Sequence, residues 1–195
     1  MKQKIGFFGG AFNPPSNVHI NIAKDLINNN VLDKVIFVPV GDYYAKDDLV
    51  AAKHRFNMLK LFCTEDEKLI VEDILVNSNK KLYASDAFGI ISQRYRNIET
   101  EIYFIMGSDN FNKISTWKNY EEFIKKYRFI VIERTESKSH SNLENITFHE
   151  IKQNDNVSST SIRKMIQEGQ DVCKYLNTEV IEYINNNNLY INNKF

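Results

Sequence analysis

Short apolar runs alternate along the chain with segments in which apolar residues recur at helical spacing. The first run, residues 5–8, combines branched and aromatic side chains and favours a buried strand. Similar runs predict strands over residues 34–40, 68–74, 101–106, 128–133 and 146–151. Apolar positions three and four residues apart predict helices from residue 16 or 17, over 51–63, 85–95 and 117–126, from 158 onward, and over 172–176 and 178–186.

Strands that alternate with helices of this length indicate βαβ units and a parallel sheet. We therefore expect one α/β domain over residues 1–195, a doubly wound, Rossmann-like parallel sheet with helices on both faces and further helices at the C-terminus. Ligands of such sheets bind at the carboxyl ends of the strands, near the point where the strand order reverses. Four of the seven glycines, Gly9, Gly10, Gly41 and Gly107, follow apolar strands and agree with that placement.

The connection after the first strand is the first candidate for chemistry. Gly9-Gly10 are expected to end the strand, since adjacent glycines permit a sharp turn and leave a surface free of side chains. Pro14-Pro15 hold the chain extended, and Ser16 or Asn17 can cap a helix whose N-terminus suits an anion. His19 lies one turn into that helix, beside the expected anion. The alternative is an ordinary structural turn, because neither GxGxxG nor GxxxxGK[ST] is present.

A second candidate anion site lies at residues 158–163, Ser-Ser-Thr-Ser-Ile-Arg. Ser158 can cap a helix, so that the N–H groups and hydroxyls of the next turn, those of Ser159 and Thr160 among them, face an anion. Arg163 follows at a distance from which its side chain can fold back over the same helix end. The alternative is a capped amphipathic helix with an arginine on its surface.

A third candidate begins at Gly107, which ends the strand over residues 101–106. Asp109 follows directly, and an acidic residue at such a strand end is suited to hydrogen-bond a ribose hydroxyl. Trp117, the only tryptophan, comes eight residues later and offers a flat face for an aromatic base or a pyridine ring. Its alternative role is that of a core anchor for the following helix.

The composition of the chain argues against several other classes of function. The 195 residues include 25 Lys+Arg and 25 Asp+Glu, so no global basic field favours a nucleic-acid partner. No apolar stretch reaches the roughly 18 residues that span a bilayer, and a strand so close to the N-terminus leaves no room for a signal peptide. Cys63 and Cys173, both in expected helices, indicate neither a disulfide nor a zinc site. We expect a cytoplasmic protein without a membrane partner. The oligomeric state stays open, and a homo-oligomer is one possibility.

These motifs together resemble a known family. Residues 9–20, GGAFNPPSNVHI, resemble the GGTFDPxHxGHL signature of the nucleotidyltransferase superfamily with the HxGH motif. Residues 157–163 resemble its ISSTxxR motif, which binds the phosphates of ATP. Residues 107–110 with Trp117 resemble the G(A/S)DN…W stretch of nicotinate-nucleotide adenylyltransferases. The resemblance runs from about residue 4 to residue 176, nearly the whole chain.

The resemblance implies a nucleotidyltransferase-type fold and transfer of AMP from ATP to nicotinate mononucleotide, giving deamido-NAD and pyrophosphate. It implies Mg²⁺ carried mainly by ATP, with no dedicated metal cluster in the protein. The catalytic residues that it implies are His19 and Arg163. Those for ATP are Gly9, Gly10, Phe12, Ser16, Gly107, Asp109, Arg134, Ser158, Ser159 and Thr160. Those for the acceptor are Lys46, Tyr83, Ser85 and Trp117, although a loop lysine such as Lys46 is as often simply solvated.

Three departures from the family pattern bear on the expected activity. Ser16 and Val18 stand where the first His and the Gly of HxGH are usual. The segment ending at Lys46 resembles a family loop that ends in PPHK, and Ala45 stands where that loop has its His. Losing a charge-assisted hydrogen bond at residue 16 costs roughly 1.5–3 kcal/mol. Two alternatives therefore stay open: a related nucleotidyltransferase with another phosphorylated acceptor, and a nucleotide-binding protein without catalysis. The sequence also leaves open whether the nicotinate or the nicotinamide nucleotide is preferred.

Overall fold

The computed structural model describes residues 2–43, 48–78, 80, 82–96, 99–133, 141, 143–150 and 157–191. Within these ranges six strands form one sheet in the order β3-β2-β1-β4-β5-β6, and every neighbouring pair is parallel. The strands are β1 (Gln3–Gly10), β2 (Lys34–Pro39), β3 (Leu69–Val71), β4 (Thr100–Gly107), β5 (Arg128–Glu133) and β6 (Ile146–Glu150). The strand order reverses beside β1, so the carboxyl ends of β1 and β4 mark the expected ligand crevice.

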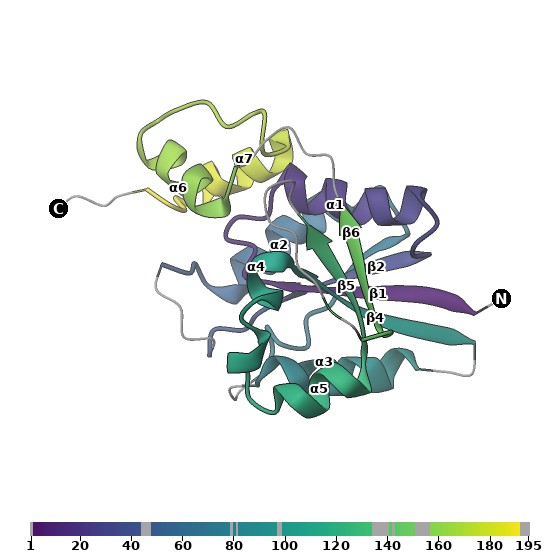
Figure 1. Ribbon diagram of the computed structural model, residues 1–195. Coiled ribbons are helices and arrows are strands. Elements are labelled where there is room, and N and C mark those ends of the chain that lie inside the picture. The colour runs from purple at the N-terminus through teal and green to yellow at the C-terminus, as the bar shows by residue number, and fades with distance from the viewer. Residues whose placement is uncertain are drawn as a thin grey trace.

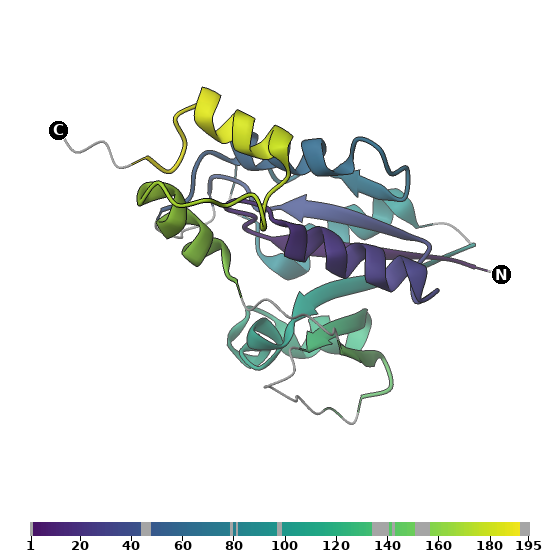
Figure 2. The same cartoon turned by 90° about the horizontal axis from the view of Figure 1, so that it is seen from above.

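Helices cover both faces of the sheet, which confirms the doubly wound α/β class (Figure 1). One face carries α1 (Asn17–Asn28) and α2 (Ala52–Cys63), and the other carries α3 (Ala84–Tyr95) and α5 (Tyr120–Lys126). Figures 1 and 2 place the last two helices beyond the carboxyl ends of the strands, on the side of α1 and α2. These are α6 (Ser159–Gln167) and α7 (Thr178–Asn186). The described chain thus ends where the ligand crevice is expected.

Successive side chains of a strand point to opposite faces, and β1 shows this directly. Phe8 belongs to the hydrophobic cluster beneath α1 and α2. Phe7 belongs to the cluster on the other face, where its ring meets the edge of Phe88 of α3 at a centroid distance of 5.5 Å. A third cluster joins the C-terminal helices to α2 through Met58, Ile162 and Val180, all fully buried. The C-terminal helices are therefore packed on the domain through a core of their own.

Several boundaries differ from the expectation. The helix expected over 117–126 begins only at Tyr120, because a short helix α4 (Ser108–Phe111) and a 3-10 turn η1 (Ile114–Thr116) come first. The strand expected over 68–74 is confined to β3. Residues 172–176 form a turn, so Cys173 lies exposed in that turn and not in a helix. Such short elements carry too few residues for a periodic pattern to mark them.

The glycine pair of β1 also behaves differently. Both glycines lie within the strand, which ends at Gly10, two residues beyond the apolar run that predicted it. The chain turns instead at Phe12, which has a positive φ of 49°. A Cβ added at Gly10 would lie 2.9 Å from the Phe12 ring, whereas one added at Gly9 would lie 3.5 Å from the ring of Phe104, an ordinary contact. Gly10 is therefore needed for the packing of Phe12 and not for a turn.

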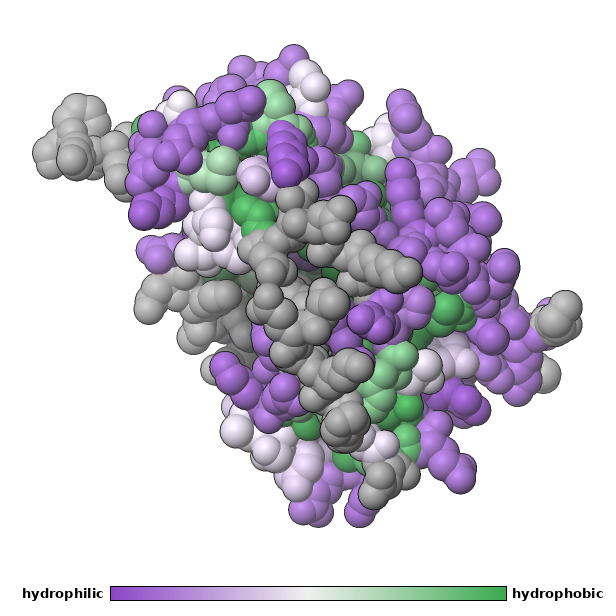
Figure 3. All heavy atoms as spheres, turned by 45° about the horizontal axis from the view of Figure 1, so that its top comes forward, coloured by the Kyte–Doolittle hydropathy of each residue, from purple (hydrophilic) through white to green (hydrophobic). Residues whose placement is uncertain are grey.

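No helix in the described ranges is long and apolar enough to cross a membrane. On the face shown in Figure 3, hydrophilic side chains predominate and the hydrophobic ones form separate patches.

The two glycines of β1 give a matched pair for a stability test. We expect Gly10→Ala to lower the free energy of unfolding by about 1–3 kcal/mol, because the buried Phe12 ring must shift to admit a methyl group. Gly9→Ala is expected to change it by less than about 1 kcal/mol, since the added methyl makes an ordinary contact. Urea unfolding followed by circular dichroism measures both. Equal losses of unfolding free energy in the two variants would contradict the conclusion that Gly10 is needed for the packing of the Phe12 ring.

Candidate active site

The loop between β1 and α1, residues 11–16, is bound by the N-terminal turn of α6. Arg163 donates from Nη1 to the carbonyl oxygen of Asn13 over 2.9 Å. Ser159 donates from Oγ to the carbonyl oxygen of Pro14, also over 2.9 Å. The Arg163 side chain also reaches back to Thr160, with Nη2 lying 3.4 Å from Oγ1. The two motifs that sequence analysis singled out as anion sites therefore meet at one loop.

A second arginine binds the same loop from α2. Arg55 is fully buried and donates from Nη1 to the carbonyl oxygen of Ala11 over 2.8 Å. Its Nε and Nη2 donate to the carbonyl oxygens of Val50 and Val40 over 2.9 and 2.6 Å. Burial lowers the pKa of Arg55, and Asp42 acts in the opposite direction. The three hydrogen bonds to carbonyl oxygens compensate for the burial of this guanidinium.

Asn13 is a buried polar residue at the centre of this loop, with 2% of its surface exposed. Its Nδ2 donates to the carbonyl oxygen of Asp48 over 2.7 Å. Its Oδ1 accepts from the N–H of Val50 over 3.3 Å and from the hydroxyl of Tyr190 over 2.9 Å. Two segments distant in sequence, residues 48–50 and Tyr190, thus fix one amide. A polar side chain with this many partners is held in a single orientation.

The imidazole of His19 is oriented by residue 16. Its Nδ1 lies 3.1 Å from the backbone nitrogen of Ser16 and 2.9 Å from the Ser16 hydroxyl oxygen. Because a backbone N–H can only donate, Nδ1 is the accepting nitrogen, and the neutral ring carries its proton on Nε2. The ring also meets the edge of Phe12 at a centroid distance of 5.1 Å. His19 can therefore present an Nε2–H donor at the helix start.

The two helix N-termini differ in the donors that they offer. At α1 the N–H of Ser16 donates to Nδ1 of His19, and the N–H of Asn17 donates to the carbonyl oxygen of Tyr175 over 2.8 Å. The expectation of available backbone donors at α1 was therefore wrong for these two groups. At α6 the predicted cap is present, because Ser158 Oγ accepts from the N–H of residue 161. Within the described ranges, no acceptor pairs with the first two N–H groups of α6, those of residues 159 and 160.

The end of β4 is open. A Cβ added at Gly107 would meet no atom within 4 Å, and Asp109 follows, exposed in the first turn of α4. Trp117 is half-buried and stacks on Phe123 with a centroid distance of 6.3 Å and an interplanar angle of 23°. The tryptophan thus packs against the core, as its alternative role requires, and still keeps part of its surface exposed.

The segment after Trp117 meets the residues before α3. Lys118 Nζ lies 4.4 Å from the centroid of the Tyr83 ring, which is 41% exposed. Ser85, in the first turn of α3, lines a polar pocket together with Asn119 and Lys126. The residues expected to bind the acceptor, as far as they fall in the described ranges, therefore lie close together. Lys46 and Arg134 lie outside the described residues.

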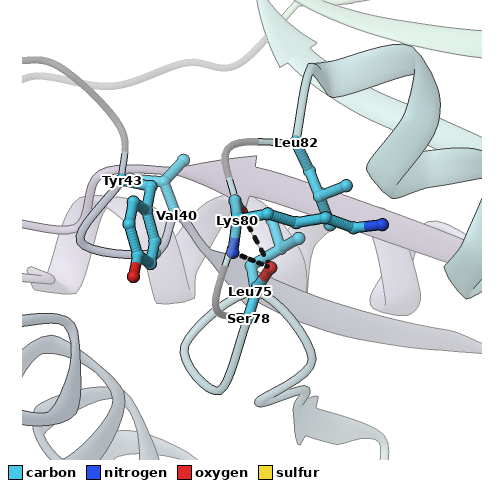
Figure 4. Close-up of a pocket in the computed structure, with 7 residues that line it drawn as sticks. Val40, Tyr43, Leu75, Ser78, Lys80 and Leu82 are labelled. Carbon is cyan, nitrogen blue, oxygen red and sulfur yellow. Dashed lines mark hydrogen bonds between the residues drawn. The ribbon is translucent and has the colours of Figure 1, made fainter.

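A further pocket lies beside the end of β2 (Figure 4). It is lined by Val40 and Tyr43 on one side, and by Leu75, Ser78 and Leu82 from the connection between β3 and α3. The N–H of residue 40 donates to the carbonyl oxygen of residue 10 over 3.0 Å, so this pocket adjoins the end of β1. It extends the open edge of the sheet toward the residues before α3.

Sequence reasoning missed Arg55, Asn13 and Tyr190 as parts of this site. A signal was present for Arg55, because it falls at the core spacing of α2 between the buried Ala52 and Met58. An arginine in such a position needs internal acceptors. No comparable pattern marks the other two.

Metal coordination by the protein itself finds no support in the donor set. Among the described residues no group of three or more His, Cys, Asp or Glu side chains could hold a metal ion.

A parallel sheet with the starts of two helices, α1 and α6, meeting at one loop beyond its carboxyl edge is typical of nucleotide-binding α/β proteins. The model of the cytidylyltransferase-like family matches residues 7–165. Relatives from Caldicellulosiruptor bescii and Lactococcus lactis are 31% and 30% identical, over 96% and 97% of this chain and 99% and 96% of their own lengths. Both carry the name "Probable nicotinate-nucleotide adenylyltransferase". The chain belongs to the cytidylyltransferase-like family and, within it, to the nicotinate-nucleotide adenylyltransferases.

Solved structures agree on the fold. The nicotinic acid mononucleotide adenylyltransferase of Plasmodium falciparum complexed with NaAD matches with a TM-score of 0.82 at 24% identity, covering 96% of this chain and 97% of that one. The same enzyme complexed with APC matches with a TM-score of 0.79 at 23% identity, with the same coverage.

Proposed function

We propose that this protein transfers AMP from ATP to nicotinate mononucleotide, forming deamido-NAD and pyrophosphate. The observation that supports this most strongly is the meeting of His19 and Arg163 at one loop, in a chain 30–31% identical to relatives named for that reaction. The phosphate of the acceptor attacks the α-phosphorus of ATP in line. The bond from that phosphorus to the bridging oxygen breaks, and pyrophosphate leaves. The protein's contribution is positioning and charge stabilisation.

The triphosphate is proposed to lie between the N-terminus of α6 and His19. The N–H groups of Ser159 and Thr160 face it as donors, while the Ser159 hydroxyl is used on the loop. Arg163 has five N–H donors and commits one to the Asn13 carbonyl and another weakly to Thr160, so others can meet phosphate. His19 donates its Nε2–H to the α-phosphate as negative charge grows there.

The nucleoside and the acceptor fit the open end of the sheet. The adenosine is proposed to lie over the end of β4, with Gly107 giving room for it and Asp109 accepting a ribose hydroxyl. The pyridine ring of the acceptor is proposed to lie between Trp117 and Tyr83, beside the Ser85 pocket. Remaining contacts to ATP are proposed for Gly9, Gly10, Phe12, Ser16, Ser158 and Arg134, and to the acceptor for Lys46. ATP enters as its magnesium complex, with the metal on phosphate oxygens and water.

Of the two alternatives left open by the sequence, the non-catalytic one loses part of its motivation. It rested partly on Ser16, and Ser16 holds the His19 ring through both its N–H and its hydroxyl. A different phosphorylated acceptor remains the rival, and a panel of acceptors with ATP distinguishes it from the proposal.

Substitution of His19 tests the catalytic proposal. We expect His19→Ala to lower kcat/KM for pyrophosphate release from ATP and nicotinate mononucleotide by about 10²–10³-fold, as for loss of one donor to a transition-state oxygen. His149→Gln is the matched control, because His149 binds Asp25 near the other end of α1 and should change activity by less than about threefold. An His19→Ala enzyme as active as the control would reject the role of His19.

The open space at Gly107 gives a second test. Gly107→Ala is expected to leave the free energy of unfolding within about 0.5 kcal/mol of the original, because the added methyl meets no protein atom. It is expected to weaken ATP binding about tenfold, a free-energy change of about 1.4 kcal/mol, because the methyl intrudes where adenosine lies. Thermal unfolding and calorimetric titration with ATP measure the two effects. Unchanged ATP affinity would place adenosine elsewhere.

A further inference from the structure

The segment after α7 returns to the loop between β1 and α1. There the Tyr190 hydroxyl lies 2.9 Å from Asn13 Oδ1, although the two residues are 177 positions apart. Both side chains are buried, with 9% and 2% of their surfaces exposed. We propose that Tyr190 is a positioning residue for adenylyl transfer, which holds the phosphate-binding loop in its active shape through the Asn13 side chain. This inference rests on the function proposed above.

The direction of this hydrogen bond is set by chemistry. Asn13 Nδ2 donates to the carbonyl oxygen of Asp48, so Oδ1 faces the other way and can only accept. Of its two donors, the Tyr190 hydroxyl is nearer than the Val50 N–H, at 2.9 against 3.3 Å. Removing the hydroxyl leaves the buried Oδ1 with only the longer bond, so the amide loses one of the three hydrogen bonds that fix its orientation.

Asn13 is bound at two points by the C-terminal part of the chain. Tyr190 binds its side chain, and Arg163 of α6 binds its carbonyl oxygen. The next residues lead through Pro14 to Ser16, whose N–H orients His19. A rotation of Asn13 would therefore move both the catalytic histidine and the carbonyl on which Arg163 rests. A displacement of about 1 Å in such groups can cost on the order of a hundredfold in rate.

Two features indicate that Tyr190 is specifically held in this position. It adopts a positive φ of 63°, a left-handed conformation that is rare for a bulky residue. Burial raises the pKa of its hydroxyl, with Arg163 and Arg55 acting in the opposite direction, so the group stays protonated and can donate. Its ring packs in the cluster that joins α7 to α2.

Tyr183 provides a matched control in the same part of the chain. Its hydroxyl is also hydrogen-bonded, accepting from Asn57 Nδ2 over 2.9 Å and lying 3.0 Å from His54 Nδ1. These partners belong to α2 and not to the loop. Tyr183→Phe and Tyr190→Phe each remove one hydrogen-bonded hydroxyl between the C-terminal helices and their surroundings, and only the second change reaches Asn13.

The experiment compares these two variants by steady-state kinetics and urea unfolding. Tyr190→Phe is expected to lower kcat about tenfold or more with the KM for ATP changed less than about threefold, since the α6 donors remain. Tyr183→Phe is expected to change kcat less than twofold with a similar shift in the urea midpoint. In an Asn13→Ala background, Tyr190→Phe is expected to have no further effect on kcat. Equal kcat values in the two tyrosine variants would overturn the proposal and leave Tyr190 a stabilising role only.

Hydrogen–deuterium exchange separates this proposal from the proposed function. Tyr190→Phe is expected to raise amide exchange in peptides covering residues 11–19 of the ligand-free protein, and Tyr183→Phe is not. This readout needs no turnover, so it stands if nicotinate mononucleotide proves not to be the acceptor. Unchanged exchange in that segment for Tyr190→Phe would show that the hydroxyl does not hold the loop.

Discussion

Two arginines bind carbonyl oxygens of the loop between β1 and α1, the loop that is proposed to lie beside the triphosphate. A carbonyl oxygen aimed at a phosphate would repel it, and Arg55 and Arg163 each engage one such oxygen from outside the loop. Each arginine also brings a positive charge to the loop. Loss of either donor would leave a carbonyl unsatisfied, at a cost of about 1–3 kcal/mol where it is buried. His19, Ser159 and Tyr190 are also hydrogen-bonded to residues of this loop.

This constraint explains why the last helices belong to the site. Arg163 reaches Asn13 from α6, whose Ile162 lies in the same buried cluster as Met58 of α2, and both residues are fully buried. The cluster that holds α6 also holds α7 and Tyr190. Loosening of this cluster would withdraw Arg163, Ser159 and Tyr190 from the loop together. The packing of the C-terminal helices and the shape of the phosphate site therefore form one cooperative unit.

The sequence predicted most of the fold because its elements are long enough to show a period. It also singled out the motifs near residues 9–20 and 157–163 as candidate anion sites, and the structure brings them together at one loop. It could not predict Asn13 or Tyr190, because an asparagine before a proline and a tyrosine near the end carry no local pattern. Their contact spans 177 positions. The strand end was misplaced because Phe12, a non-glycine residue, adopts the positive φ.

Ser16, which replaces the first His of the HxGH motif, leaves the orientation of the His19 ring intact. The orientation of His19 depends on the backbone N–H of residue 16, which any residue but proline supplies. A serine there therefore keeps the Nδ1-accepting ring and its proton on Nε2, and its hydroxyl adds a second contact at 2.9 Å. A histidine at this position would add its own positive charge, or its own hydrogen-bond donor, toward the proposed phosphate. Without it, the donors at the α6 N-terminus and the side chains of Arg163 and Arg55 are still at the loop.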